Sequence, residues 1–168
     1  PLALYAIKMI QADLVDSYNG DMAKRDSMHN AQCLAGMAFS NALLGIVHSM
    51  AHSLGAVYDT PHGVANAILL PTVMEYNAPC TGDKYKYIAK AMGVEGVDDM
   101  TQEEYRKAAV DAVKKLSQDV GIPADLKAIV KDEDVQFLAE SAYADACRPG
   151  NPRDTSVEEI KALYRSLM

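Results

Sequence analysis

The sequence predicts an all-α, multi-helix bundle, and three observations carry this prediction. Apolar residues make up 49% of the 168-residue chain, and Ala, Leu, Met and Val account for most of them, with no Trp and only two Phe. Ala, Leu and Met are strong helix formers. Apolar residues also recur at helical spacing, as Leu4, Ile7, Ile10 and Leu14 do. No segment shows the alternating pattern that is typical of a β-strand.

Breaks, caps and turn residues divide the chain into expected helices, which we take to form a single helical domain over residues 1–168. The expected helices cover residues 2–18, 22–45, 46–57, 62–77, 83–92, 101–119, 131–146 and 155–167. A short helical turn is expected at 124–130. Pro71 should kink or interrupt the fourth helix, because proline lacks an N–H and its ring clashes with the preceding turn.

Four of the helix starts carry a residue that can cap them. Asp21 can accept hydrogen bonds from the free N–H groups of the second helix. Thr60 is the expected N-cap of the fourth helix, with proline at the first helical position. Thr101 is followed by Glu104 and fits a capping box, and Thr155 is expected to open the last helix in the same way.

Charge and cysteine usage argue against several classes of protein. The net charge is −7 and no basic run is present, so a nucleic-acid partner is not expected. Cys33, Cys80 and Cys147 are widely spaced, which indicates reduced thiols in a cytoplasmic protein. The longest apolar run, near residues 65–71, is too short to span a bilayer, so no membrane association is expected. The chain begins inside an expected helix, and we interpret it as a fragment of a longer one.

Three of the four histidines fall in one stretch, GIVHSMAHSLGAVYDTPHG at residues 45–63. His48 and His52 are four residues apart and share one face of a helix. His62 follows at the start of the next helix, where a sharp turn would bring it to the same place. Imidazole binds Zn, Fe, Ni and Co, so the spacing indicates a metal site. The alternative is three core histidines, each satisfied by a hydrogen bond.

This stretch and the residues after it resemble the signature of the iron-containing (group III) alcohol dehydrogenases. The pattern is G-x-x-H-x-x-A-H-x-L-G, about five residues, then P-H-G-x-x-N-A-x-L-L-P, and every position is filled here. GMAFSNALLG and GNPRDTS also fit, so the resemblance covers essentially the whole chain. It implies a dehydroquinate synthase-like helical domain that carries Fe²⁺, or alternatively Zn²⁺. Its expected partner is an N-terminal Rossmann-like domain that binds NAD or NADP.

The resemblance also implies roles for individual residues. His48 and His62 match metal ligands of the family, and His52 matches a non-ligand histidine near the nicotinamide and the substrate. We therefore expect His52 to be catalytic, and His52 and His62 to lie next to the cofactor. Phe39 is a candidate for lining the substrate pocket, with plain core packing as the alternative. Asn66 is expected to hydrogen-bond the turn that precedes it.

The family's other two ligands, an Asp and a His in a D-x-x-x-H arrangement, have no counterpart in these 168 residues. Asp26 and His29 are three residues apart and are expected to form a solvated helix face. The chain alone is therefore expected to bind metal weakly and to be inactive.

The implied activity is the reversible interconversion of small alcohols or diols and aldehydes by hydride transfer, in a homo-oligomer. Two alternatives stay open. One is a related zinc enzyme similar to glycerol dehydrogenase. The other is a helical module that binds a metal or a partner without catalysis.

Overall fold

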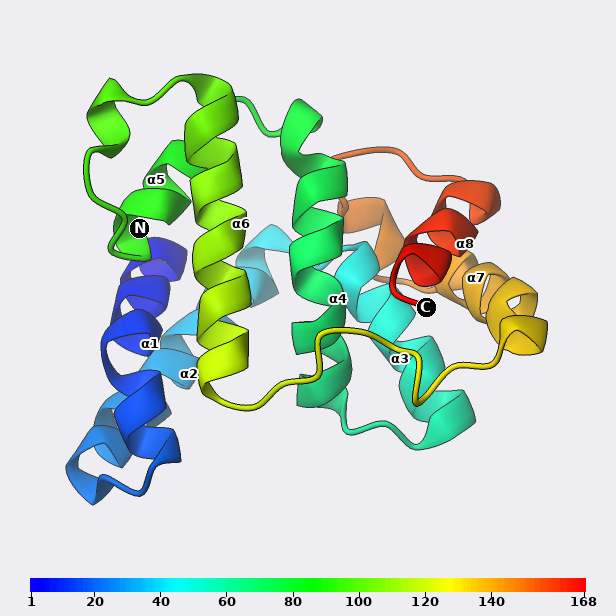
Figure 1. Cartoon of the computed structure of the whole chain (residues 1–168), viewed down its shortest axis with the longest axis horizontal. Helices are drawn as coiled ribbons and strands as arrows, with labels where there is room; N and C mark the ends of the chain where they lie inside the picture. The colour runs from blue at the N-terminus through cyan, green and yellow to red at the C-terminus, as the bar shows by residue number, and fades with distance from the viewer. The chain divides into compact units, whose positions relative to one another are not determined.

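The computed structural model describes residues 1–168 and contains eight α-helices and no strand. Figure 1 shows these helices along the chain. The helices are α1 Leu2–Tyr18, α2 Met22–Ala42, α3 Ile46–Tyr58, α4 His62–Asn77, α5 Lys84–Ala91, α6 Gln102–Asp119, α7 Val135–Ala144 and α8 Val157–Ser166. Four 3₁₀ turns are interspersed: η1 Ala78–Cys80, η2 Val97–Asp99, η3 Asp132–Asp134 and η4 Arg148–Gly150. The predicted all-α class is confirmed.

The chain divides into two compact units. Unit 1 comprises Pro1–Ala42 and Thr81–Gly121, and unit 2 comprises Leu43–Cys80 and Ile122–Met168. The single domain expected over residues 1–168 stays a prediction. No single helix has both the length and the hydropathy that a membrane-spanning helix needs, and only α2 and α3 taken together meet that test.

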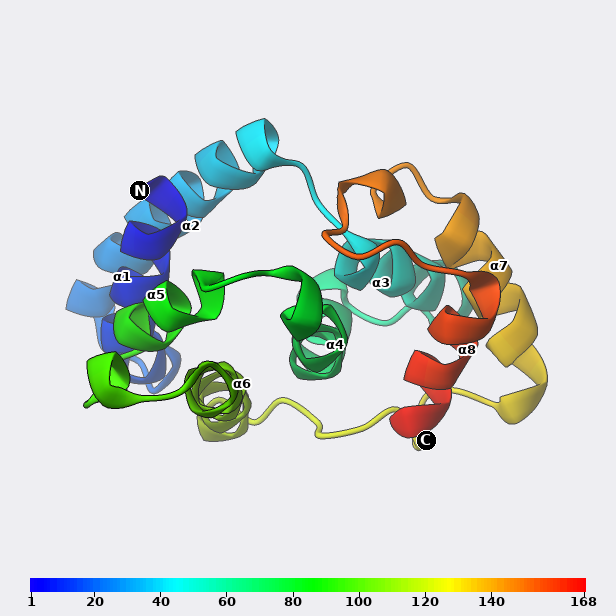
Figure 2. The ribbon, with the colours of Figure 1, turned by 90° about the horizontal axis from the view of Figure 1, so that it is seen from above.

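Unit 1 contains a hairpin of α1 and α2 and a second pair, α5 and α6, as Figure 2 shows. Asp21 caps α2, because its Oδ1 accepts the N–H of Ala23 at 2.9 Å, as predicted. Thr101 and Glu104 form the predicted capping box at the start of α6. These caps satisfy backbone donors that a helix start otherwise leaves unpaired.

Unit 2 has its core between α3, α4, α7 and α8. The largest fully buried side chains include Ile46, Met50, Leu54, Leu69, Leu138 and Tyr164. The Tyr164 hydroxyl donates a hydrogen bond of 2.8 Å to the carbonyl of Met50 and so ties α8 to α3 inside the core. One face of α3 is thereby fixed, while the side chains of His48 and His52 lie outside the fully buried set.

In the first half of the chain, one helix end and one expected helix cap differ from the prediction. The second helix ends at Ala42 instead of residue 45, because Leu43 has a left-handed backbone with φ of 68°. The fourth helix begins at His62 without a side-chain cap, so the expected Thr60 cap is wrong. Pro61 is extended, with φ −54° and ψ 129°, and takes the cap position itself. Pro71 lies inside α4 and does not interrupt it.

The second half also differs in three places. Residues 124–130 form turns without a helix, and the N–H of Leu126 donates to the carbonyl of Leu167 at 2.8 Å. The helix expected over 131–146 begins as η3 and ends at Ala144. The last helix is capped by Ser156 instead of Thr155, whose hydroxyl donates to the Arg153 carbonyl at 3.1 Å.

Candidate functional site

The turn between α3 and α4 brings three histidine rings together in unit 2. His48 and His52 lie one turn apart on α3, with ring centroids 6.1 Å apart. His62 is the first residue of α4, and its ring centroid lies 5.4 Å from that of His48 and 5.4 Å from that of His52. Asp59 reverses the chain with a left-handed φ of 52°. The structure thus assembles the triangle of imidazoles that the spacing suggested.

Burial acts on the ring of His48, and the Asn66 side chain contacts the ring of His62. Burial lowers the pKa of His48, and positive charge on His62 or His52 would lower it further. The Asn66 amide nitrogen lies 3.1 Å from Nε2 of His62 and donates at 2.9 Å to the His62 carbonyl. Because an amide NH₂ group can only donate, Nε2 of His62 is the unprotonated nitrogen. Asn66 therefore bonds His62, the first residue of α4, whereas the expected partner was the turn before this helix.

Asp145 belongs to the site, although no sequence motif indicates it. Asp145 directly follows α7, and its Oδ2 lies 2.9 Å from Nδ1 of His52. Burial opposes ionisation of this carboxyl, but the backbone N–H of Cys147 and the His52 ring outweigh it and lower the pKa of Asp145. No local pattern marks Asp145, because it lies 93 residues from His52 along the chain.

His52, Asp145 and Cys147 place one possible ligand atom each within 4.8 Å of one another. Burial raises the pKa of the Cys147 thiol, and the neighbouring Asp145 carboxylate raises it further. A metal ligand would need the thiolate. His52 and the backbone N–H of Cys147 both contact the Asp145 carboxylate. These contacts explain why the three residues lie together, and the explanation requires no metal ion.

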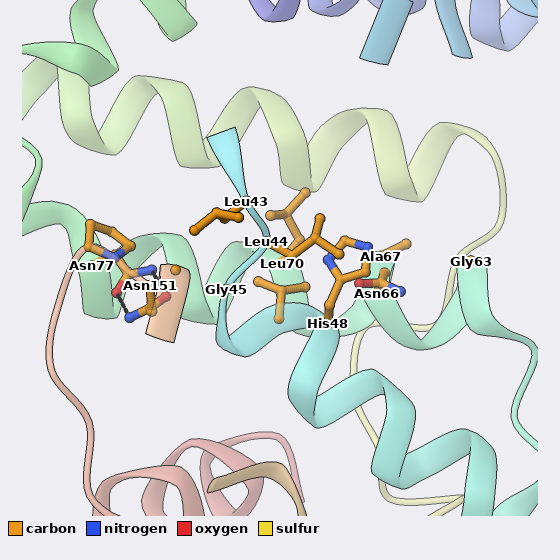
Figure 3. A pocket seen from close by; sticks show the side chains of 13 residues that line it. Leu43, Leu44, Gly45, His48, Gly63, Asn66, Ala67, Leu70, Asn77 and Asn151 are labelled. Carbon is orange, nitrogen blue, oxygen red and sulfur yellow. Dashed lines mark hydrogen bonds between the residues drawn. The ribbon is translucent and has the colours of Figure 1, made fainter. Parts of the chain in front are cut away.

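A cavity of about 540 Å³ opens beside His48, also within unit 2. In Figure 3, His48 and Asn66 stand at one end of the cavity and the paired amides of Asn77 and Asn151 at the other. The two amides exchange hydrogen bonds of 2.9 Å in both directions. Between the ends the lining is mostly apolar and includes Leu43, Leu44, Val47 and Leu70.

The other residues considered from the sequence are not part of the histidine cluster. Phe39 is on α2 in unit 1, is 45% exposed and does not line the cavity, so its place in a substrate pocket stays a prediction. Asp26 and His29 are exposed on α2, as expected for a solvated face. Cys147 is a half-buried thiol beside the site.

An all-α chain with clustered histidines beside an apolar cavity defines the class, a helical domain with a histidine-lined site. Comparison with known proteins gives the family. The model described as "Fe-containing alcohol dehydrogenase family, C-terminal" matches residues 1–168. The chain belongs to the Fe-containing alcohol dehydrogenase family.

Individual relatives agree with this assignment. The chain is 52% identical over 166 residues to lactaldehyde reductase of Escherichia coli K12, covering 98% of this chain and 43% of that protein. It is 46% identical to the NADPH-dependent butanol dehydrogenase of Clostridium saccharobutylicum, covering 98% and 43%. The solved structure of an alcohol dehydrogenase from Oenococcus oeni superposes with a TM-score of 0.93 at 39% identity, covering 98% of this chain and 44% of that one. The chain thus spans less than half the length of these relatives.

Proposed function

We propose that this chain is the metal-carrying helical part of an NAD(P)-dependent dehydrogenase that interconverts small alcohols or diols and aldehydes. The observation that carries the proposal is the meeting of His48, His52 and His62 beside an apolar cavity. The relatives include a lactaldehyde reductase and an NADPH-dependent butanol dehydrogenase, and these names support the substrate class.

His48 and His62 would hold the divalent metal, Fe²⁺ or alternatively Zn²⁺. Their chemistry fits such an ion, because metal-binding imidazoles must be neutral. The lowered pKa of His48 favours its neutral ring, and a metal bound at Nε2 of His62 would replace the contact that this atom makes with the Asn66 amide nitrogen at 3.1 Å. The buried Oδ1 of Asn66 has no hydrogen-bond partner within the chain and leaves an unused acceptor next to His62.

When bound, the metal supplies a Lewis acid for the substrate oxygen, and NAD or NADP supplies or accepts the hydride. This chain's residues do the remaining work. The apolar side chains of the cavity would receive the alkyl part of a small alcohol and exclude water from it. His52 would accept the hydroxyl proton during oxidation and return it during reduction.

The remaining partners follow from the same proposal. The ring of His52, whose side chain is 42% exposed, and the exposed His62 would face the nicotinamide of a cofactor held by an N-terminal domain. The NADPH-dependent relative supports a nicotinamide cofactor in general. We also propose a cytoplasmic homo-oligomer, without a nucleic-acid or membrane partner.

The test is replacement of His62 in the complete dehydrogenase, this chain joined to its cofactor-binding domain. Outer partners of metal ligands are alone worth about 10–100-fold in metal affinity or activity, so loss of a direct ligand should cost at least that much. We expect His62→Ala to lose its iron or zinc, measured by elemental analysis, together with alcohol-dependent NAD(P) reduction.

His29→Ala is the matched control, because it removes an exposed histidine of α2 outside the cluster. Its metal content and turnover should equal those of the unaltered enzyme. Full metal occupancy in His62→Ala would reject His62 as a ligand. Metal binding without any alcohol-dependent turnover in the unaltered enzyme would instead favour a non-catalytic metal-binding module.

A further inference from the structure

The contact between His52 and Asp145 joins two elements that are distant in the sequence. His52 lies in the middle of α3, and Asp145 follows the last residue of α7. Oδ2 of Asp145 lies 2.9 Å from Nδ1 of His52. A carboxylate can only accept hydrogen bonds, so the proton of a neutral His52 ring lies on Nδ1. Nε2, on the opposite edge of the ring, then carries the free lone pair.

The second oxygen of Asp145 is held by other donors. Oδ1 accepts the backbone N–H of Cys147 at 2.7 Å, and the hydroxyl of the buried Ser49 lies 3.3 Å away. The Cys147 N–H closes a short turn directly after Asp145, so the carboxylate is fixed by its own loop as well as by α3. The Asp145 carboxylate that orients the His52 ring is therefore itself held in place by Cys147 and Ser49.

We propose that Asp145 is a positioning residue, which fixes the Nδ1–H tautomer of His52 and turns Nε2 towards the reacting groups. The inference rests on the proposed function, because the tautomer matters for catalysis only if His52 handles the proton of the alcohol. Asp145 itself acts through His52 and would touch neither substrate nor cofactor.

The Asp145→Asn variant is informative because the loop dictates how an amide must sit. The backbone N–H of Cys147 can only donate, so the carbonyl oxygen of the new amide must face it. The NH₂ group then faces Nδ1 of His52 and can only donate in turn. His52 must accept at Nδ1 and carry its proton on Nε2. An almost isosteric change thereby reverses the tautomer.

The first experiment is ¹⁵N NMR of the imidazoles in the full 168-residue chain without metal, at a pH at which the ring is neutral by its own ¹⁵N shifts. His52→Gln assigns the signal. We expect His52 to be Nδ1-protonated in the unaltered chain and Nε2-protonated in Asp145→Asn. Asp145→Glu retains a charged acceptor and should keep the Nδ1–H form. An Nε2–H ring in the unaltered chain, or one tautomer in both the unaltered chain and Asp145→Asn, would overturn the proposal.

The second experiment measures kinetics and metal content in the complete dehydrogenase. Asp145→Asn should lower kcat by about 10–100-fold, the loss that is seen when a metal-binding histidine loses its orienting partner, with metal content and KM for the cofactor unchanged. Asp145→Glu should recover part of kcat. Asp132→Asn is the control, because this exposed carboxylate, 77% exposed, lies in unit 2 and only approaches Arg165 at 3.6 Å.

The two experiments separate the possible failures. Unchanged kcat in Asp145→Asn despite a reversed tautomer would overturn the positioning role, even though the hydrogen bond exists. An equal loss in Asp145→Asn and Asp145→Glu would point to a structural role and also overturn it. If the complete protein oxidises no alcohol, the proposed function fails, whereas the NMR result still decides whether Asp145 sets the tautomer.

Discussion

Asp59 is the residue on which the meeting of the three histidines depends. It follows α3 in a left-handed conformation, with φ 52° and ψ 30°, and its N–H donates to the Gly55 carbonyl at 3.1 Å. A left-handed backbone costs an ordinary residue about 1–2 kcal/mol, and Asp tolerates it better than most. The reversal takes only residues 59–61, after which His62 already lies beside His48. One polar residue in an unusual conformation thus places a candidate ligand.

Gly150 supports the cavity through a close approach of two backbones. A Cβ at this position would lie 2.0 Å from the carbonyl oxygen of Leu44 and 2.9 Å from Cβ of Leu43. We expect Gly150→Ala to destabilise the chain by about 1–3 kcal/mol, as overpacking does, because a backbone oxygen cannot move aside cheaply. Urea unfolding followed by circular dichroism measures the change.

Gly36→Ala is the matched control for this prediction. Gly36 lies inside α2 and has no atom within 4 Å of an added Cβ. Alanine is the better helix former, so this variant should gain about 0.5–1 kcal/mol. A Gly150→Ala chain as stable as the unaltered one would show that Leu44 is not held where the structure places it.

At the scale of the element, most of the helices could be predicted from the sequence, but not all of their ends. Thr101 and Glu104 were recognised as a capping box because both partners are local and polar. Near α8, two overlapping pairs fit the same pattern, and the structure uses Ser156 with Glu159. The Thr155 hydroxyl is engaged with a carbonyl and is buried, which a sequence pattern does not reveal.

The residues of the candidate site could likewise be predicted only in part. The three histidines could be predicted together because they fall within residues 48–62, where helix periodicity and one turn relate them. Asp145 could not, since only tertiary packing of α7 against α3 brings it to His52. The same residue explains why α7 ends at Ala144. Asp145 is extended with ψ 142°, and its side chain takes the Cys147 N–H that a longer helix would have used.

The capping box of α8 predicts a pH dependence of stability. The backbone N–H and hydroxyl of Ser156 donate to Glu159 and lower the pKa of its carboxyl below 4.5. A lowered pKa in the folded state contributes stability above the unfolded pKa, and that stability is lost as the pH falls through the folded pKa. We expect Glu159→Gln to cost about 0.3–1 kcal/mol near neutral pH and nothing in acid. Urea unfolding across this pH range measures it.

Glu158→Gln removes the same charge one position earlier, where the carboxylate reaches only Lys161 at 3.1 Å. An exposed ion pair of this kind contributes little. Its cost should therefore stay smaller than that of Glu159→Gln at neutral pH. A larger cost for Glu158→Gln would show that α8 begins one residue earlier than the structure places it.

At the scale of the whole molecule, the candidate site belongs to one of the two units. The three histidines, Asp145 and every residue lining the cavity lie within Leu43–Cys80 and Ile122–Met168. The relative positions of the three histidines and Asp145 follow from the packing of α3, α4 and α7. Unit 1 contributes none of these residues, and its α2 carries Phe39, the remaining candidate for the substrate pocket.

The ligand count leads to a prediction for the chain as a whole. His48 and His62 are two neutral ligands, and a charged carboxylate is expected to complete a site for a divalent cation. No D-x-x-x-H arrangement supplies it within these 168 residues. We therefore expect the chain alone to bind Fe²⁺ or Zn²⁺ at least about 100-fold more weakly than the complete dehydrogenase, by competition with a chromogenic chelator. It should also reduce no aldehyde with NADH or NADPH.

Tight metal binding by the chain alone would show that its own residues complete the site, and His52 and Asp145 would then be the first to test as the missing ligands. Turnover by the chain alone would contradict the need for a separate cofactor-binding domain.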